Sequence, residues 1–307
     1  MIDQYISIFN KIDFNRIIDH PNILIAAAFW DDERYMAART CYKYMRTIDD
    51  MIDCHKSEHK IISENEKQQF IRNVKDWIAM ARNAVNTNID DHELMHTIRT
   101  FHIPMWPLEE FANSMMYDID HNGFQTVDEF VRYSQGASVA PASIFVHLSG
   151  LKKYEEGYIP PSFDVRTAAT PCAMFSYLVH IIRDFQKDQQ NNLNYFADDI
   201  MARNGLTRTD LMNMANGHAI KEGFRNMIRE YLTLADLYRQ ETYRIIQDIW
   251  PLLEPRYRLS LLIIFNLYLM VFDRIDVDKG KFSSEELNPA PSEIREKVLK
   301  TISTFRD

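Results

Sequence analysis

The chain has 307 residues, of which 46% are hydrophobic and 26% are charged, a balance typical of a folded globular protein. Its net charge of −9 lacks the basic excess of nucleic-acid-binding proteins, which excludes nucleic acid as a partner. Eight glycines are few for this length, which disfavours a many-stranded sandwich or barrel. Cys41, Cys54 and Cys172 show no CxxC spacing, which disfavours a disulfide framework or a cysteine zinc site and favours a cytoplasmic location.

Apolar residues recur at helical spacing along almost the whole chain. One such series is Ala37, Cys41, Tyr44, Ile48 and Ile52. The same pattern predicts helices over 33–53, 67–85, 107–117, 126–148, 164–190, 217–250, 256–274 and 291–304. Prolines separate several of these helices, and no alternating strand pattern or internal repeat is present. We therefore predict one all-α domain over residues 1–307 with about eight to ten helices, and a loop at 151–163.

Neither a signal peptide nor a membrane span is expected. The N-terminus has no basic start followed by an apolar run, which a secretory signal would need. The most apolar stretch, Leu259–Phe272, has 14 residues, whereas a helix needs about 20 to cross a bilayer. We therefore predict that this stretch is a buried core helix.

Two acidic clusters each combine an arginine with carboxylates four residues apart on a predicted helix. The first contains Arg46, Asp49, Asp50 and Asp53, and the second contains Arg183, Asp184 and Asp188. Carboxylates at this spacing share one helical face and repel each other, so the pattern costs stability unless a cation binds. Two such faces opposed across a bundle would offer the hard oxygen ligands that Mg²⁺ prefers, and arginine binds phosphate well. The repeated pattern favours a magnesium and phosphate site over two solvated helix ends.

The residues around both clusters resemble the two aspartate-rich motifs of the squalene/phytoene synthase family. In chain order the similar segments are 42–53 (YKYMRTIDDMID), 116–118 (MYD), 126–137 (TVDEFVRYSQGA), 180–188 (HIIRDFQKD) and 194–196 (NYF). The resemblance covers roughly residues 20–275, and the order and spacing of its motifs are specific. It implies an all-α isoprenoid-synthase helical bundle with a central cavity.

The resemblance also implies a reaction and a site. The reaction is Mg²⁺-assisted loss of diphosphate from an allylic prenyl diphosphate, farnesyl or geranylgeranyl, and head-to-head coupling to a squalene- or phytoene-like product. NADPH is implied only if the product is squalene-like, and peripheral contact with a membrane is expected only because such products are apolar. The implied site consists of metal ligands (Asp49, Asp50, Asp53, Asp184, Asp188, His180), diphosphate-binding residues (Arg46, Arg183, His20) and cavity tyrosines (Tyr42, Tyr133, Tyr195, Tyr268). Aromatic rings around a dry cavity would stabilise the carbocation and exclude water.

Several positions depart from the family pattern. The serine-containing N-terminal segment is replaced by HPNILIA at 20–26, and the Gln-x-x-Asn that commonly begins the second motif is replaced by Tyr177 and His180. Leu193 stands where the family usually has an arginine, and the late arginine expected after Tyr268 is not evident. The metal-binding half is thus intact, whereas part of the half that grips the second substrate is altered. A terpene cyclase, a prenyltransferase with another acceptor and a non-catalytic family member remain open alternatives.

Two further motifs point to other metals. HELMH at 92–96, with His102 beyond it, matches the HExxH zinc-hydrolase pattern, but Arg99 replaces the glycine needed before a third ligand. The segment 118–129 matches the D-x-D-x-N-G-x5-E calcium loop, although Gln125 occupies the usual apolar position. Zinc chemistry is therefore disfavoured, and calcium binding at 118–129 is left open.

Overall fold

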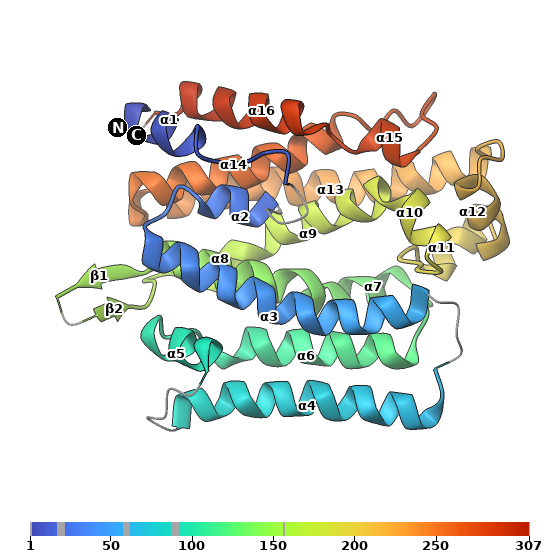
Figure 1. The fold of residues 1–307 in the computed structure, drawn as a ribbon. Helices are drawn as coiled ribbons and strands as arrows, with labels where there is room; N and C mark the ends of the chain where they lie inside the picture. Colours follow the sequence, from blue (N-terminus) through green and yellow to red (C-terminus); the bar gives the residue numbers. More distant parts are fainter. Residues whose placement is uncertain (1, 17–21, 58–61, 87–91, 156, 307) are drawn as a thin grey trace.

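Figure 1 shows the computed structural model of the chain, which consists almost entirely of helices. The structure describes residues 2–16, 22–57, 62–86, 92–155 and 157–306. In chain order the elements are α1 (Ile2–Phe9), α2 (Asn22–Ala27), α3 (Asp32–Ser57), α4 (Glu64–Asn86), α5 (Glu93–Thr100), α6 (Met105–Asp120), α7 (Val127–Ser134), η1 (Gln135–Val139), α8 (Ala140–Gly150), β1 (Lys152–Tyr154), β2 (Gly157–Ile159), α9 (Val165–Arg183), α10 (Phe185–Gln190), α11 (Asp198–Arg203), α12 (Arg208–Ala215), α13 (Glu222–Ile249), η2 (Trp250–Leu252), α14 (Pro255–Phe272), α15 (Ser284–Leu287) and α16 (Pro291–Thr304). The predicted all-α class is confirmed for this part of the chain.

Helix α3 crosses the bundle from the end that carries the two strands toward the end where α10 to α12 lie (Figure 1). Its first turn is stabilised by Asp31, whose Oδ1 accepts a hydrogen bond from the backbone N–H of Arg34 at 3.0 Å. Its buried stripe consists of Ala37, Cys41, Met45, Ile48 and Ile52. These residues follow one another at three- and four-residue steps, so one face of α3 packs into the core.

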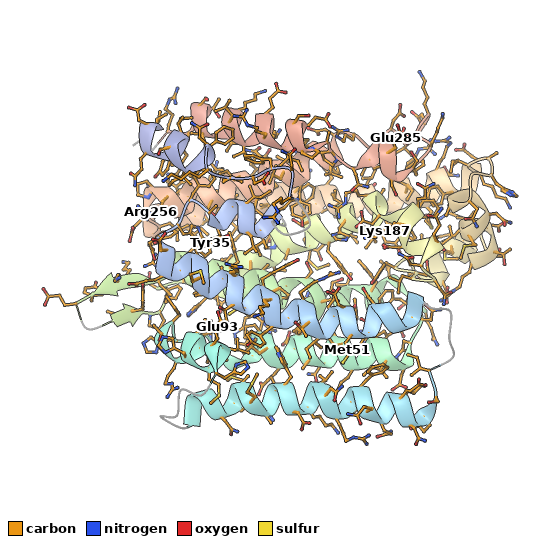
Figure 2. All side chains as sticks on the ribbon, viewed as in Figure 1. Tyr35, Met51, Glu93, Lys187, Arg256 and Glu285 are labelled. Atoms are coloured by element: carbon orange, nitrogen blue, oxygen red, sulfur yellow. The ribbon has the colours of Figure 1, made fainter. Side chains whose placement is uncertain are left out.

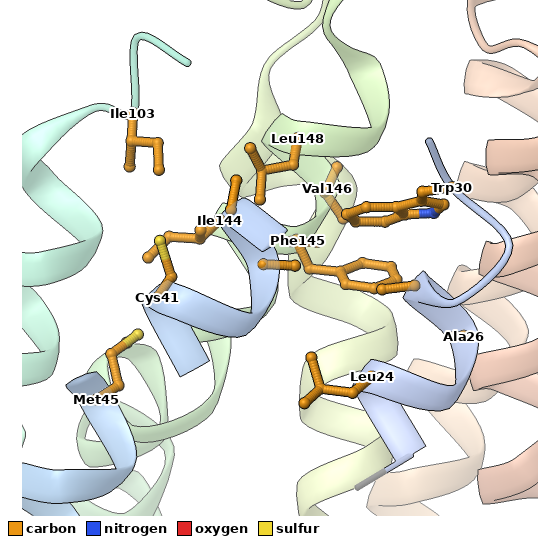
Figure 3. Close-up of a cluster of buried hydrophobic side chains, with 14 of the residues drawn as sticks. Leu24, Ala26, Trp30, Cys41, Met45, Ile103, Ile144, Phe145, Val146 and Leu148 are labelled. Carbon is orange, nitrogen blue, oxygen red and sulfur yellow. The ribbon is translucent and has the colours of Figure 1, made fainter. Parts of the chain in front are cut away.

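The core on the α3 side is built from aliphatic and aromatic side chains of α2, α3 and α8. The ring centroids of Trp30 and Phe145 are 4.5 Å apart, and Figure 3 shows both rings close to Leu24. On the other side of the same core, Cys41 and Ile144 face each other in Figure 3. All five side chains are buried, which fixes α2 and α8 against the N-terminal half of α3.

A short hairpin replaces the loop predicted at 151–163. Strands β1 and β2 have three residues each and pair antiparallel, with Lys152 opposite Ile159. Tyr158 ties the hairpin to α3, because its hydroxyl donates to Glu33 Oε2 at 2.5 Å and its ring lies 5.2 Å from the guanidinium of Arg34. Arg34 itself is buried and donates to the backbone oxygen of Leu151 at 2.9 Å. Strands this short leave no readable alternation, so the loop prediction was wrong here.

The helix predicted over 126–148 is interrupted by a π-helical turn, η1, between α7 and α8. Its Gly136 packs so closely on α6 that an added Cβ would overlap the backbone oxygen of Glu110 and the Oγ of Ser114. The hydroxyl of Ser114 donates to the backbone oxygen of Tyr133 at 2.9 Å, just before the turn. The turn therefore sets how α7 and its last residues lie against α6.

The helix predicted over 164–190 is likewise two helices. Asp184 ends α9 with φ −93° and ψ 5°, and α10 begins at the next residue. The backbone N–H of Asp188 still donates to the carbonyl oxygen of Asp184 at 2.8 Å, so the two carboxylates keep a helical separation across the break.

Helix α14 contains the apolar stretch at 259–272 and is longer than that stretch. With 18 residues and a mean hydropathy of 1.2, it is the one helix of the described ranges long and apolar enough to cross a membrane. This is weak evidence for a membrane span, because core helices pass the same test. In the structure α14 packs against α2, α9 and α16, as a core helix does.

Candidate active site

The first acidic cluster lies near the C-terminal end of α3. Arg46 pairs with two carboxylates of its own helix, with Nη1 at 2.8 Å from Asp49 Oδ2 and Nη2 at 2.5 Å from Asp50 Oδ1. Burial and repulsion from Asp53 raise the pKa of Asp49 to about 7. Burial and repulsion from Asp118 raise the pKa of Asp53 to about 6. The cluster therefore holds more negative charge than its single arginine balances.

The second cluster contains two aspartates in opposite environments. Arg183 donates to both oxygens of Asp184, Nε to Oδ1 at 2.7 Å and Nη2 to Oδ2 at 2.8 Å, and His180 Nε2 lies 2.8 Å from Oδ2. Burial alone would raise the pKa of Asp184, but His180 and Arg183 hold it well below its usual range. For Asp188, burial and repulsion from Asp184 and Asp53 raise the pKa to about 8.

The two clusters lie in the same region, although they are far apart in the sequence. The charge of Asp53 on α3 raises the pKa of Asp188 on α10 and also that of Tyr195, which requires these groups to be near one another. Figure 2 shows Met51, beside the first cluster, and Lys187, beside the second, toward the same end of the bundle. The structure thus brings the predicted clusters together, while their role as metal ligands stays a prediction.

The donors in this region fit a magnesium ion that binds together with substrate. Within the described ranges no group of three His, Cys, Asp or Glu side chains is arranged to hold a metal ion. Mg²⁺ needs no such cage, since proteins usually bind it through one or two carboxylates, waters and substrate phosphates. The raised pKa values of Asp49, Asp53 and Asp188 indicate that burial and mutual repulsion of the carboxylates outweigh the charge of the neighbouring arginines and lysines. A divalent cation would supply further positive charge.

Three tyrosines line the same region, of which Tyr133 is buried and Tyr177 and Tyr195 are half-buried. The ring centroids of Tyr133 and Tyr177 are 6.5 Å apart, and those of Tyr177 and Tyr195 are 6.2 Å apart. Burial raises the pKa of all three hydroxyls well above the usual value, and neighbouring aspartates add to the effect. These hydroxyls therefore stay neutral in the folded protein at ordinary pH.

The other two predicted tyrosines lie next to the arginines. Burial raises the pKa of Tyr42 and of Tyr268, while Arg46 opposes the shift for Tyr42 and Arg183 opposes it for Tyr268. Tyr42 also raises the pKa of Tyr268, so the two hydroxyls lie near each other. The four predicted tyrosines thus border the region between the acidic clusters.

Sequence reasoning missed three residues of this site: Lys56, Asp118 and Tyr177. The hydroxyl of Tyr133 donates to Asp118 Oδ2 at 2.5 Å, and Lys56 Nζ lies 3.2 Å from Asp118 Oδ1. Lys56 follows Asp53 by three residues on α3, so its position one helical turn beyond the cluster was a readable signal. The role of Asp118 was not readable, because it depends on contacts with two distant helices.

Two cavities adjoin the region. The larger, about 720 Å³, is lined by α6, α7 and the loop between them, and it reaches Tyr133. The smaller, about 70 Å³, has a mostly apolar lining, to which Arg183, Asn22 and Asn288 add polar side chains. His20 lies outside the described residues, so its predicted role stays a prediction.

The HExxH motif takes part in helix packing. His92 is the N-cap of α5 with φ −149°, and its Nδ1 accepts from the backbone N–H of Leu94 at 3.3 Å. Its Nε2 lies 3.1 Å from the hydroxyl of Tyr44, and Glu93 accepts a hydrogen bond from Thr40 at 2.8 Å. These contacts join α5 to α3, which agrees with the low weight given to zinc chemistry.

The 118–129 segment does not form a calcium loop. Asp118 is engaged by the contacts described above, and Asp120 Oδ1 pairs with a lysine of α4 at 3.0 Å. Glu129 Oε2 accepts from the backbone N–H of Gln125 at 2.7 Å. A calcium loop needs these carboxylates to converge on one ion, and here they bind separate partners. The structure therefore gives the calcium alternative no support.

Known proteins resemble the chain in both sequence and fold. The chloroplastic phytoene synthase of an Oncidium hybrid cultivar is 22% identical over 251 residues, which are 80% of this chain, and the chain spans 56% of that protein's length. A crystal structure of a dehydrosqualene synthase with ligand matches with a TM-score of 0.68 at 14% identity, covering 99% of this chain and 98% of that one. The squalene synthase HpnC of Alicyclobacillus acidocaldarius matches with a TM-score of 0.57 at 13% identity, covering 81% and 96%.

The structural matches, at such low identity, show a shared fold. The family assignment rests on the sequence: the squalene/phytoene synthase family model matches residues 21–292, which include both acidic clusters. The chain therefore belongs to the squalene/phytoene synthase family, whose members are prenyltransferase-type enzymes.

Proposed function

We propose that this protein ionises allylic prenyl diphosphates with Mg²⁺ and couples two of them head to head. The observation that carries the proposal is the proximity of Asp53 and Asp188, with Tyr195 near both carboxylates. A prenyl diphosphate has a highly charged end and a reactive apolar end. The site offers carboxylates and arginines for the first and aromatic rings for the second.

The charged part of the site would bind the diphosphate. Asp49, Asp53 and Asp188 are the carboxylates suited to hold Mg²⁺, which when bound would stabilise the charge that develops on the departing diphosphate. Arg183 lies at the wall of the small cavity and can donate to phosphate oxygens. Arg46 is half exposed and can turn from its own carboxylates toward the substrate.

The aromatic part of the site would protect the allylic cation. Tyr133, Tyr177 and Tyr195 are neutral, so their ring faces can attract a cation without contributing charge. Exclusion of water favours reaction of the cation with the second prenyl chain over its reaction with water.

Incubation of the purified protein with farnesyl or geranylgeranyl diphosphate tests the proposal. With Mg²⁺ we expect release of diphosphate and a product with twice the carbon number of the prenyl group, because coupling joins two identical chains. A chelator should abolish both. Parallel reactions with and without NADPH distinguish a reduced product from an unreduced one. Absence of diphosphate release from both substrates by folded protein would refute the proposal.

One observation favours a second candidate, ionisation of a single prenyl diphosphate followed by cyclisation or transfer to another acceptor. Asp184 is already paired with Arg183 and His180, which leaves fewer free groups for a second diphosphate. In that case the same incubation would release diphosphate but yield only products with the substrate's own carbon number, or adducts of the other acceptor.

A further inference from the structure

A chain of hydrogen bonds links three helices behind the tyrosines of the site. Tyr133 on α7 donates its hydroxyl proton to Asp118 Oδ2 on α6 at 2.5 Å. The other oxygen of Asp118 lies 3.2 Å from Lys56 Nζ on α3, and Lys56 also donates to the backbone oxygen of His121 at 3.0 Å. Only 12% of the side-chain surface of Lys56 and of Asp118 is exposed. The pair is thus largely desolvated, and each partner compensates the charge of the other.

Tyr177 lies beside Tyr133, with ring centroids 6.5 Å apart. A tyrosine hydroxyl has a single proton, and that of Tyr133 is committed to Asp118. Toward Tyr177, and toward any ligand, the oxygen of Tyr133 can therefore only accept.

The direction of the hydrogen bond between Tyr133 and Asp118 depends on Lys56. An ionised carboxylate can only accept hydrogen bonds, whereas a protonated carboxyl group can also donate one, and Lys56 is a cation in contact with Asp118. Burial raises the pKa of Asp118, and the charge of Lys56 opposes that rise. Without Lys56 the carboxyl would be driven to bind a proton, which it could then donate to Tyr133, so that the Tyr133 hydroxyl would be free to donate elsewhere.

We propose that Lys56 and Asp118 are positioning residues, which hold the Tyr133 hydroxyl as a hydrogen-bond acceptor facing the reacting prenyl chain. This inference rests on the proposed function. An acceptor oxygen stabilises positive charge on carbon, whereas a hydroxyl that points its proton at the same carbon destabilises it. Orienting the hydroxyl before the cation forms avoids a reorganisation during the reaction.

Lys56 could also act through the first acidic cluster, because its charge lowers the pKa of Asp53. The two routes give different results when Tyr133 is removed. If Lys56 acts through the hydroxyl, its replacement has no further effect in a Tyr133→Phe background. If Lys56 acts through Asp53, its replacement lowers kcat by the same factor with and without the Tyr133 hydroxyl.

The test is a double-mutant cycle in the full chain, with farnesyl and geranylgeranyl diphosphate as substrates. We expect Lys56→Met to lower kcat by roughly 10- to 100-fold while KM changes by less than about threefold. In the Tyr133→Phe background the same substitution should change kcat by less than about twofold. Lys56→Arg, which keeps the charge, should recover most of the loss. If Lys56→Met lowers kcat equally in the wild-type and Tyr133→Phe backgrounds, the inference is overturned.

Two further variants separate positioning from stability. The double variant Lys56→Met, Asp118→Leu removes the buried pair together, so it should melt at a higher temperature than Lys56→Met alone but keep its low kcat. Recovery of kcat with stability would mean that the pair is only structural. Lys67→Met is the matched control. Lys67 on α4 forms an ion pair with Asp120, an exposed residue on the same helix as Asp118, and its replacement should leave kcat unchanged. A wild-type protein that consumes neither substrate would refute the proposed function itself.

Discussion

Replacing Asp53 with asparagine is expected to lower prenyl diphosphate consumption by about a thousandfold. Asparagine has the same shape but lacks the charge needed to hold Mg²⁺ near the departing diphosphate. Asp53 also lies close to the other segments of the site, since its charge raises the pKa of Asp188 and of Tyr195. The measurement is diphosphate release at saturating Mg²⁺, compared with the wild type.

The same variant should be more stable than the wild type in metal-free solution, by about 3 kcal/mol near pH 8. Burial and Asp118 raise the pKa of Asp53 from 3.8 to about 6, so the folded state binds this proton more tightly than the unfolded state. The ionised carboxylate therefore costs most stability above the folded pKa of about 6, and the cost shrinks as the pH falls from there toward the unfolded pKa of 3.8. Melting curves with chelator should show the two proteins approaching each other below pH 6 and converging only below about pH 3.8.

Asp50→Asn is the matched control for both measurements. The side chain of Asp50 is 46% exposed and paired with Arg46, and it contributes least to the raised pKa values of Asp49 and Asp53, so its removal should raise the melting temperature much less than Asp53→Asn does. Its effect on activity should be much smaller than that of Asp53→Asn. An Asp53→Asn protein that keeps activity within about threefold of the wild type would exclude Asp53 as a metal ligand.

Gly136→Ala should destabilise the protein by about 3 kcal/mol, through steric overlap between the π-helical turn and α6. The added Cβ would meet the backbone oxygen of Glu110, which cannot move without displacing the helix. The shift would also displace Tyr133, since Ser114 on α6 bonds to its backbone oxygen. Chemical denaturation gives the free energy of unfolding, and we expect kcat to fall in the protein that remains folded.

Gly205→Ala separates this steric effect from the general cost of replacing glycine. Gly205 has φ +66° and nothing within 4 Å of an added Cβ, so only backbone strain of about 1 kcal/mol is expected. If the two variants lose equal stability, close packing of η1 on α6 is not what requires Gly136.

The helices that carry the acidic clusters could be predicted because their local patterns are strong. Both clusters lie on segments with regular apolar spacing, and helical geometry places carboxylates four residues apart on one face. The break at Asp184 left no sign in the sequence, because the hydrogen bond from Asp188 to its carbonyl keeps the helical period. The π-helical turn did leave a sign, because Pro141 stands just beyond it and cannot donate a backbone hydrogen bond inside a continuous helix.

Contacts between distant segments explain what sequence reasoning missed at the site. Tyr177 was noted only as a departure from a family pattern, yet its ring packs between Phe130 and Tyr195. Asp118 matched a calcium loop because its neighbours have suitable side chains, but its partners come from α3 and α7. Such partners follow from how helices pack, which local patterns do not encode.

Helix α3 separates two tasks along its length. Near its start, Arg34 joins the hairpin and α14, since its guanidinium lies over the rings of Tyr158 and Tyr257. The first acidic cluster begins with Arg46 and ends at Asp53, 19 residues beyond Arg34, or roughly 28 Å at 1.5 Å per residue. Substitutions that far apart usually act additively. Evolution can therefore alter the chemistry at one end of this helix while the architecture anchored at the other end persists, which is a physical basis for divergent reactions on one scaffold.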